Sequence, residues 1–528
     1  MKKEIRNIGF MLVLAGIVFS CKVGPNYQEP ENETPQTFRY TNSATDSIIN
    51  LHWWDLFHDP VLDTLIVTAL RQNKDLLIAA SRIEQARANV KFKKADYGPK
   101  IGVDAYAGVS NQILGLPTDN NFESYGVAGT FNWELDFWGK FRRSTEAAQA
   151  EMMGSFYGKR AIEIALISEV ATNYFELLDF KSRLRISEST LALRDSTLQI
   201  IQARFDEGYT HIIDVNQAEI QKGITQASVP RFKRNIAFSE HNLNLLMGKN
   251  MDSILTFKEL QDYALPDSIP TGIPSEILRR RPDILQSEQF YKSQNANIGV
   301  AVAQRFPSIS LTGMLGLGST DLSNLLSNGL GWSAGASLLG PLFEWGKNAR
   351  RVDIERELAK QYLLEYERTV LTALLEVNNA LVELSTYNEE LIANEMKMRA
   401  AKNASSLSRQ RYYQGVTSYL EVIENQRQEF DARLAYSENY QLLLSSYIGL
   451  YKSLGGGWVS EAELEKYAAQ VAEEQNVDVN TINRDSLFYN GQVVDFYLTP
   501  EQEEERKAER KRIKEEERAA RKAAKKNN

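Results

Sequence analysis

The motif Arg204-Phe-Asp-Glu-Gly208-Tyr-Thr210-His-Ile-Ile-Asp214-Val215 returns 207 residues further along the chain as Arg411-Tyr-Tyr-Gln-Gly415-Val-Thr417-Ser-Tyr-Leu-Glu421-Val422. Trp138-Gly139-Lys140 returns at the same distance as Trp345-Gly346-Lys347. This constant spacing predicts that one structural unit is written twice. Two copies are fewer than a stacked solenoid needs, so we expect a closed, pseudo-symmetric ring instead.

Each copy has the same predicted order of elements: a helix, a β-hairpin, a very long helix and a shorter returning helix. The first copy, residues 61–250, opens at Asp59-Pro60, because Asp is a favoured N-cap and Pro a favoured first helical residue. It continues with one helix to about residue 96, a β-hairpin at 100–135, a long helix at 142–206 and a returning helix at 211–248. The second copy, residues 275–458, has a helix, a β-hairpin at 307–341, a long helix at 348–412 and a returning helix at 418–454. Residues 251–274 are predicted to connect the two copies, and residues 459–500 to follow the second copy. Both are predicted equatorial segments, that is, segments around the middle of the long helices. Residues 501–528 form a charged tail.

Both predicted hairpins have the pattern of membrane strands. In the first, Ile101, Val103 and Ala105 alternate with small or polar residues over about eleven positions, the length of a tilted strand that crosses a bilayer. The second has no charged residue between Asp321 and Glu344. A strand pair of an ordinary β-sandwich fits the same alternation, so that alternative stays open.

The two long helices exceed the length of globular helices. A helix of about 65 residues extends roughly 97 Å, which indicates a coiled-coil or α-barrel setting. Gly208 and Gly415 follow the long helices, and glycine at this position predicts a left-handed C-terminal cap. We therefore expect two long helical hairpins in each chain.

The N-terminus has the pattern of a lipoprotein signal peptide over residues 1–20. A positively charged start precedes an apolar stretch that is too short to span a bilayer comfortably. Cys21, the single cysteine of the chain, follows directly. Acylation of Cys21 would anchor residues 21–60 to a membrane, and Lys22 after it favours the outer membrane. The alternative is an incidental cysteine beside the cleavage site.

Composition excludes several classes of function. The net charge is −8, so no basic stripe is available to bind nucleic acid. None of the four histidines has a metal-binding or base-relay spacing, and the chain contains no glycine loop for phosphate. We therefore expect no enzymatic activity, no cofactor and no bound metal.

Six further motifs are specific as a set. They are Cys21-Lys-Val-Gly24-Pro25-Asn-Tyr27, Trp53-Trp54-Asp-Leu-Phe57-His-Asp59-Pro60, Ala69-Leu70-Arg-Gln-Asn73-Lys-Asp75-Leu76, Trp133-Glu-Leu-Asp136-Phe-Trp138-Gly139, Arg280-Arg281-Pro282-Asp283-Ile284 and Leu454-Gly455-Gly456-Gly457-Trp458. With them the chain resembles the TolC-like outer-membrane efflux channels, in the NodT-like lipoprotein branch that serves resistance-nodulation-division pumps. The resemblance implies a mainly α protein with a membrane β-barrel. It implies a homotrimer in which four strands per chain close a twelve-stranded barrel above a long α-helical barrel.

The resemblance also implies a function and partners. The implied function is the exit duct of a tripartite efflux pump, lipid-anchored in the outer membrane with its α-barrel in the periplasm. The implied partners are a periplasmic adaptor protein, an inner-membrane resistance-nodulation-division pump and outer-membrane lipid. Two alternatives remain: the exit duct of a type I protein secretion system, and a lipid-anchored periplasmic coiled-coil structural protein. The residues implied to meet the adaptor are Arg204, Gly208, Thr210, Arg411, Gly415 and Thr417. The alternative is that these residues only cap the helices.

An acidic pair marks the implied gate. Glu421 and Glu424 lie three residues apart on one face of the second returning helix. They match the family's constriction positions, so in a trimer each would form a ring of carboxylates that attracts cations and repels anions. The first-copy counterparts are Asp214 and Gln217, and this inequality predicts that one hairpin swings open while the other stays fixed. A solvated helix face is the alternative.

Overall fold

The computed structural model describes residues 23–30, 35, 38, 57–113, 116–263, 277–327 and 329–456. All of them belong to one compact unit, residues 1–458. Several predicted features lie outside the described residues: the signal peptide, Cys21, most of residues 31–56, residues 264–276, residues 459–500 and the charged tail.

The first predicted helix is two helices, α2 (Pro60–Gln72) and α3 (Lys74–Ala95). The side chain of Asp59 accepts a hydrogen bond from the backbone N–H two residues on, which confirms the predicted N-cap. The expectation of one continuous helix was wrong because Asn73 leaves the helical conformation, with ψ 130°. The Asn73 side chain caps α3 and also donates to the carbonyl of Leu246, 2.9 Å away.

Two helical hairpins follow the β-hairpins. The long helices α4 (Lys140–Asp206) and α8 (Lys347–Tyr413) have 67 residues each, and the returning helices α5 (Ile212–Leu246) and α9 (Tyr419–Ser453) have 35 each. α8 contains neither glycine nor proline, so nothing interrupts its backbone hydrogen bonds. At 1.5 Å per residue, each long helix is about 100 Å long. No helix in the described ranges is long and apolar enough to cross a membrane.

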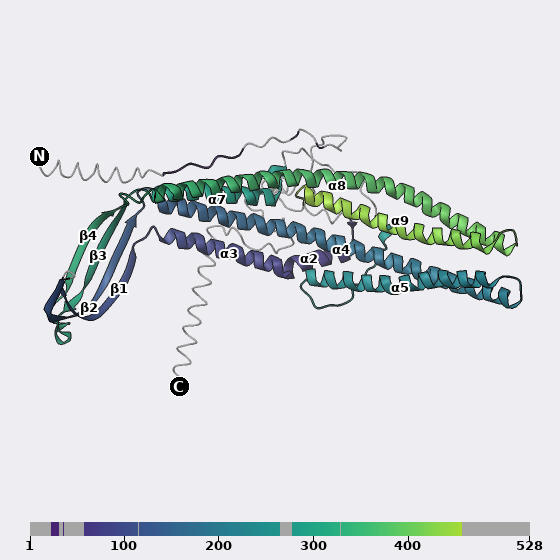
Figure 1. The fold of residues 1–528 in the computed structure, drawn as a ribbon, viewed down its shortest axis with the longest axis horizontal. Helices are drawn as coiled ribbons and strands as arrows, with labels where there is room; N and C mark the ends of the chain where they lie inside the picture. The colour runs from purple at the N-terminus through teal and green to yellow at the C-terminus, as the bar shows by residue number, and fades with distance from the viewer. Residues whose placement is uncertain are drawn as a thin grey trace, which may run out of the picture. The chain divides into compact units, whose positions relative to one another are not determined.

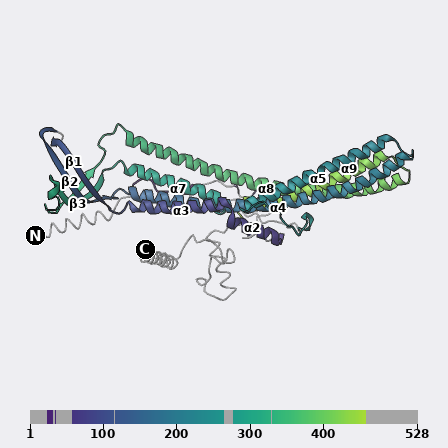
Figure 2. The same ribbon diagram turned by 90° about the horizontal axis from the view of Figure 1, so that it is seen from below.

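The helices form a layer with two free borders. α7 (Pro282–Ala303), which follows the short α6 (Ile277–Arg280), takes the place beside α8 that α3 takes beside α4. Near the sheet the packing order is α3, α4, α7, α8, and toward the helix-hairpin turns it is α5, α4, α9, α8 (Figures 1 and 2). Within the described part of the chain, α3 and α5 form one border and α8 the other.

A buried core fastens the second half of this layer together. Ile284 of α7 and Leu450 of α9 are fully buried against Val377 of α8. The same cluster includes Phe38, Ile277, Tyr366, Val370, Ala373, Ala380, Leu381 and Leu454. Burial of this apolar surface, rather than helical propensity alone, stabilises the long helices.

The four strands form one antiparallel sheet. β1 (Lys100–Ile113), β2 (Leu116–Leu135), β3 (Ser308–Ser319) and β4 (Gly331–Leu339) lie in that order. The hairpins are joined because β2 pairs with β3, with Trp133 opposite Leu311. β1 and β4 are border strands, each paired on one side only among the described residues. Two short 3-10 helices, η2 (Leu260–Asp262) and η4 (Leu322–Asn324), complete the described elements.

The two faces of the sheet differ in chemistry. On one face, Ile101 lies opposite Phe131, and Leu315 lies opposite Trp332. The other face carries mainly small or polar residues, with Met314 and Leu339 as apolar exceptions: Gly102, Asp104, Tyr106, Ser124, Gly126, Thr130, Asn132, Glu134, Ser310, Thr312, Gly318, Ser333 and Gly335. Such an alternation of apolar and polar faces is the pattern of transmembrane barrel strands.

Candidate functional site

The repeated motif forms the two helix-hairpin turns. Gly208 follows α4 with φ 80°, and Gly415 follows α8 with φ 75°, which confirms the predicted left-handed caps. At each turn the N–H after the glycine donates to a carbonyl of the long helix, from Tyr209 to Arg204 and from Val416 to Arg411. A Cβ on either glycine would meet nothing within 4 Å. The backbone conformation, and not crowding within this chain, therefore requires glycine.

A threonine closes each turn onto an acid in the same way. The Thr210 hydroxyl donates to the carboxylate of Asp214, and the Thr417 hydroxyl donates to that of Glu421. Both acids lie in the first turn of a returning helix, where the positive end of the helix dipole favours a negative charge. These four predicted residues therefore have a structural role in the turns, whatever else they do.

The two repeated arginines make different contacts. The Arg411 guanidinium pairs with Glu421 at 2.9 Å, within its own turn. The Arg204 guanidinium instead lies 4.9 Å from the centre of the Tyr412 ring, across from one turn to the other. Arg204 thus links the two hairpins, and Arg411 stiffens one of them.

An apolar cluster joins the hairpins beside the turns. Ile201 and Val215 from the first hairpin are buried with Tyr419 and Val422 from the second. The Tyr412 and Tyr419 rings lie 5.5 Å apart. Burial raises the pKa of the Tyr419 phenol well above its ordinary value, so this side chain is neutral. The hairpins are therefore packed against each other at this end.

The second acid of the predicted gate is paired with an arginine. The Arg427 guanidinium binds Glu424 through two bonds of 2.6 and 3.0 Å, and it also contacts Asp431 at 3.0 Å. Hydrogen bonds from Arg427 and Gln428 hold the pKa of Glu424 below its ordinary value. Together with the Arg411 pair at Glu421, this means that both acids of the second hairpin's gate pair have a neighbouring positive charge, whereas Asp214 accepts from the Thr210 hydroxyl.

The turns also expose apolar side chains that the sequence prediction passed over. Tyr209 is 82% exposed at the first turn, and Val416 is 63% exposed at the second. Ile212, Ile213, Tyr413 and Leu420 are exposed around them. An apolar residue directly after a turn glycine was the available signal.

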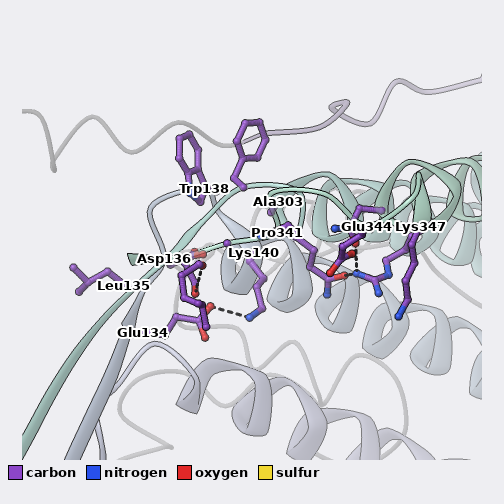
Figure 3. Close-up of a pocket in the computed structure, with 16 residues that line it drawn as sticks. Glu134, Leu135, Asp136, Trp138, Lys140, Ala303, Pro341, Glu344 and Lys347 are labelled. Atoms are coloured by element: carbon purple, nitrogen blue, oxygen red, sulfur yellow. Dashed lines mark hydrogen bonds and ion pairs between the residues drawn. The ribbon is translucent and has the colours of Figure 1, made fainter. Parts of the chain in front are cut away.

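The ends of the strands form a polar cavity at the junction with the helices. Its volume is about 510 Å³, and it lies between the ends of β2 and β4 and the starts of α4 and α8 (Figure 3). Lys140 points to Glu134 and pairs with it at 2.8 Å, while Arg351 donates to Gln304 at 2.9 Å. Among the lining residues, Glu134 belongs to the mainly small and polar face of the sheet.

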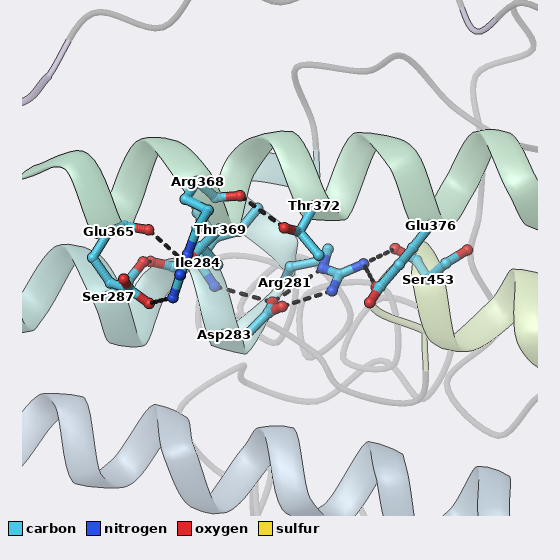
Figure 4. Close-up of polar contacts among 10 residues, drawn as sticks. All are labelled: Arg281, Asp283, Ile284, Ser287, Glu365, Arg368, Thr369, Thr372, Glu376 and Ser453. Atoms are coloured by element: carbon cyan, nitrogen blue, oxygen red, sulfur yellow. Dashed lines mark hydrogen bonds and ion pairs between the residues drawn. The ribbon is translucent and has the colours of Figure 1, made fainter.

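A buried arginine holds the second half together at mid-length. Figure 4 shows Arg281 between α7, α8 and α9. Its guanidinium contacts Asp283 at 2.6 Å, Glu376 at 2.7 Å and the carbonyl of Ser453 at 2.9 Å. The motif around Arg281 is thus a structural junction. No group of His, Cys, Asp and Glu in the described ranges could hold a metal ion.

Residues 23–27, which we call the strap, are bound to the starts of the helices. The Val23 N–H donates to the carbonyl of Trp138 at 3.4 Å, at the β2–α4 junction. The fully buried Arg143 donates to the carbonyls of Val23 and Gly24, both at 3.2 Å, and to the Asn26 side chain at 2.9 Å. The Tyr27 hydroxyl donates to Glu288 of α7 at 2.7 Å. Cys21 itself lies outside the described residues.

Comparison with known proteins gives matches over most of the chain. A family model described as outer membrane efflux protein matches residues 65–249 and again residues 273–456. The toluene efflux pump outer membrane protein TtgC of Pseudomonas putida is 31% identical over 475 residues, which cover 87% of this chain and 98% of TtgC. The cation efflux system protein CusC of Escherichia coli is 30% identical over 453 residues, 83% of this chain and 96% of CusC. The solved outer-membrane channel OprN is 30% identical with a TM-score of 0.78, over 83% of this chain and 100% of OprN.

Proposed function

Because the chain belongs to the family of outer membrane efflux proteins, we propose that it forms the exit duct of a tripartite efflux pump and conducts substrates passively from the periplasm to the exterior. The observation that carries this proposal is the sheet with one apolar and one polar face, joined directly to two long helical hairpins. In the proposed arrangement, the apolar face meets lipid and the polar face lines a water-filled pore. TtgC and CusC are named for toluene and for cations, so the family does not identify the substrate.

The protein resides in the outer membrane, as its relatives do. The proposed lipid anchor on Cys21 agrees with the position of the strap. Val23, two residues after Cys21, is bound at the junction between sheet and helices, where acyl chains reach the periplasmic leaflet. Mass spectrometry of the mature N-terminus tests the anchor, and an unmodified Cys21 contradicts it.

The working form is proposed to be a homotrimer. In one chain the border strands β1 and β4 leave hydrogen-bonding groups unpaired, and a membrane strand must pair them. The border helices also expose apolar side chains, several of them four or seven residues apart. These are Ile213, Ile220, Ile224 and Phe238 on α5, and Leu364, Leu371, Leu375, Ile392 and Met396 on α8. Packing α8 of one chain on α3 and α5 of the next buries both sets and closes a ring.

The duct is proposed to descend from one unit written twice. The equal lengths of α4 and α8 and of α5 and α9 support this, as does a family model that matches each half separately. In the trimer, the two copies together supply four strands per chain to one twelve-stranded barrel.

The helix-hairpin turns are proposed to dock a periplasmic adaptor protein, which connects the duct to an inner-membrane resistance-nodulation-division pump. The exposed apolar residues around Tyr209 and Val416 favour a protein partner, since such side chains supply much of the stability of interfaces. The two turn glycines leave room for close approach. The polar residues Thr210 and Thr417 hold the turns in shape.

The same end of the duct is proposed to carry the gate. Glu421, Glu424 and Asp214 would line it, with Arg411 and Arg427 compensating part of the acidic charge. Opening would then separate the second hairpin from the first and break the Arg204–Tyr412 contact and the apolar cluster beside it.

Conductance of the purified protein in planar lipid bilayers tests the duct. We expect discrete channels from a trimer that shifts its gel mobility on heating. A lipid-anchored coiled-coil structural protein would give neither, and that result would overturn the proposal. Co-purification separates the two kinds of duct, because an efflux adaptor supports the pump and a secretion adaptor supports a type I system.

A further inference from the structure

The first hairpin buries a cation that has no carboxylate partner among the described residues. Arg194 of α4, fourteen residues before Gly208, is 2% exposed. One nitrogen donates to the carbonyl of Gln221 at 2.6 Å and to the hydroxyl of Thr225. Its Nε and second terminal nitrogen are buried with no hydrogen-bond partner in the described part of the chain. The equivalent residue of the second copy is Ala401, so the repeated architecture does not require this charge.

Two further orphan groups lie at the same height. The side-chain oxygen of Gln221 on α5 and the side-chain nitrogen of Gln426 on α9 are buried without partners, and Gln426 is 6% exposed. Gln221 and Gln426 lie thirteen and eleven residues after their turn glycines, so all three side chains are about 20 Å from the turns. The Phe430 ring, one turn along α9, lies 5.2 Å from the Arg194 guanidinium. We call Arg194, Gln221 and Gln426 the polar layer.

Two acids near Arg194, one beside it in the sequence and one that acts on its charge, are paired with other cations. Asp195 pairs with Lys222, and Asp431 pairs with Arg427. Burial, partly offset by Asp431 and Tyr419, lowers the pKa of the Arg194 guanidinium, as expected for a charge removed from water. A buried donor or acceptor without a partner weakens the packing that buries it. The polar layer therefore opposes the close packing of α9 on the first hairpin.

The contacts on either side of the layer differ from it. Toward the turns, the apolar cluster around Ile201 and Val422 holds the hairpins together. Away from the turns, Ser437 of α9 donates to Asp179 of α4 at 2.6 Å, and Tyr440 donates to the carbonyl of Tyr263 at 2.7 Å. The last contacts fasten α9. Among the described residues, the part of α9 between the apolar cluster and Ser437 makes no hydrogen bond to α4 or α5, and its Phe430 ring contacts Arg194.

We propose that the polar layer is a conformational device that keeps the periplasmic end of the duct poised for opening. When the lower part of α9 moves away from α4 and α5, water reaches Arg194, Gln221 and Gln426 and satisfies their orphan groups. The layer thereby stabilises an arrangement with separated hairpins relative to the packed one, and the apolar cluster at the turns opposes it. This inference rests on the proposed function, because it assumes that the two hairpins separate.

A buried reporter measures the separation directly in the full-length protein. Ala218→Cys places a thiol in the apolar cluster, and Ala171→Cys places one in α4 above the Asp179–Ser437 contact, where we expect slow labelling throughout. Adding Arg194→Met should slow maleimide labelling of Ala218→Cys roughly fivefold. The reason is that the substitution removes buried donors without partners, and one such group costs the packed arrangement about 1 kcal/mol. Gln426→Leu should slow it in the same direction. Thr225→Val removes an acceptor from Arg194 and should speed it.

These signs decide the inference. Protein without an added cysteine gives the background, and unchanged trimer mobility and circular dichroism show that each variant folds. If Arg194→Met and Gln426→Leu leave labelling unchanged or faster, or if Thr225→Val slows it, the polar layer does not have this role. Absence of bilayer conductance in the unsubstituted protein would instead overturn the proposed duct, whatever the labelling shows.

Discussion

Three substitutions at glycines separate a helix cap from a docking surface. Gly208→Ala adds a Cβ where φ is 80° and no atom lies within 4 Å. Gly208→Asn adds a larger side chain to the same position, but asparagine adopts the left-handed conformation more readily. Gly223→Ala is the matched control, because Gly223 lies inside α5 with equally open surroundings and no positive φ.

The magnitudes follow from the backbone alone. An alanine in the left-handed region costs about 1–2 kcal/mol, and the lost flexibility of glycine in the unfolded chain offsets up to about 1 kcal/mol of this. Gly208→Ala should therefore destabilise the turn by about 1 kcal/mol, which is about fivefold in local opening. Gly223→Ala should stabilise its helix by about 1 kcal/mol. The same chemical change thus has opposite signs fifteen residues apart in one chain.

Hydrogen exchange with mass spectrometry, on peptides that cover the turn and the middle of α5, measures both effects. If the turn exchanges no faster in Gly208→Ala than in the unsubstituted protein, the cap argument is refuted. Adaptor co-purification then separates the two roles of the glycine. If Gly208 is needed only as a cap, Gly208→Asn should return both the exchange rate and adaptor co-purification toward the values of the unsubstituted protein. If Gly208 is needed for close approach of the adaptor, Gly208→Asn should return the exchange rate alone.

Three other predictions concern charged groups. Arg427→Gln should leave Glu424 uncompensated and raise the preference for cations, measured as a reversal potential at low salt, and the effect should vanish near 1 M salt because of screening; an unchanged potential at low salt contradicts the gate assignment. Burial raises the pKa of Asp179 despite its arginine partner, so the folded state binds the proton more readily and stability should fall as pH rises above the ordinary value of 3.8. Asp179→Asn should flatten that part of a plot of melting temperature against pH, and an unaltered slope counts against the assignment. Tyr27→Phe removes the hydrogen bond to Glu288 and should weaken the binding of the strap by about 1 kcal/mol. The measurement is the rate of proteolytic cleavage within or beside the strap, which should rise. Equal cleavage rates would show that the bond is unimportant.

The sequence predicted what depends on neighbours along the chain. The strand alternation from Ile101 onward places both hairpins, and the turn glycines Gly208 and Gly415 place the ends of the long helices, because backbone conformation is set by a few adjacent residues. The repeat spacing predicts the ends of each helix and strand a second time, because each element has a counterpart in the other copy. These are the features on which sequence and structure agree within a few residues.

What the sequence missed depends on contacts between distant segments. Asn73 breaks the first helix because its side chain also bonds the end of α5, far along the chain. Arg204 and Arg411 occupy equivalent positions, yet one meets the ring of Tyr412 and the other an acid of its own turn. Glu424 is predicted as part of an acidic ring, and its ion pair with Arg427, three residues on along α9, reduces the charge that this ring carries.

The strap has a consequence for the order in which the protein matures. Tyr27 bonds a residue 261 positions away, and Val23 bonds one 120 positions away. Contacts this distant in sequence form only after the intervening chain has been exported and folded. A lipid anchor on Cys21 would therefore hold the nascent chain at a membrane long before its strap has a surface to lie on. Docking of the strap on Arg143 and α7 therefore needs the chain to be present at least as far as Glu288, and protection of the strap from protease would mark the formation of these long-range contacts.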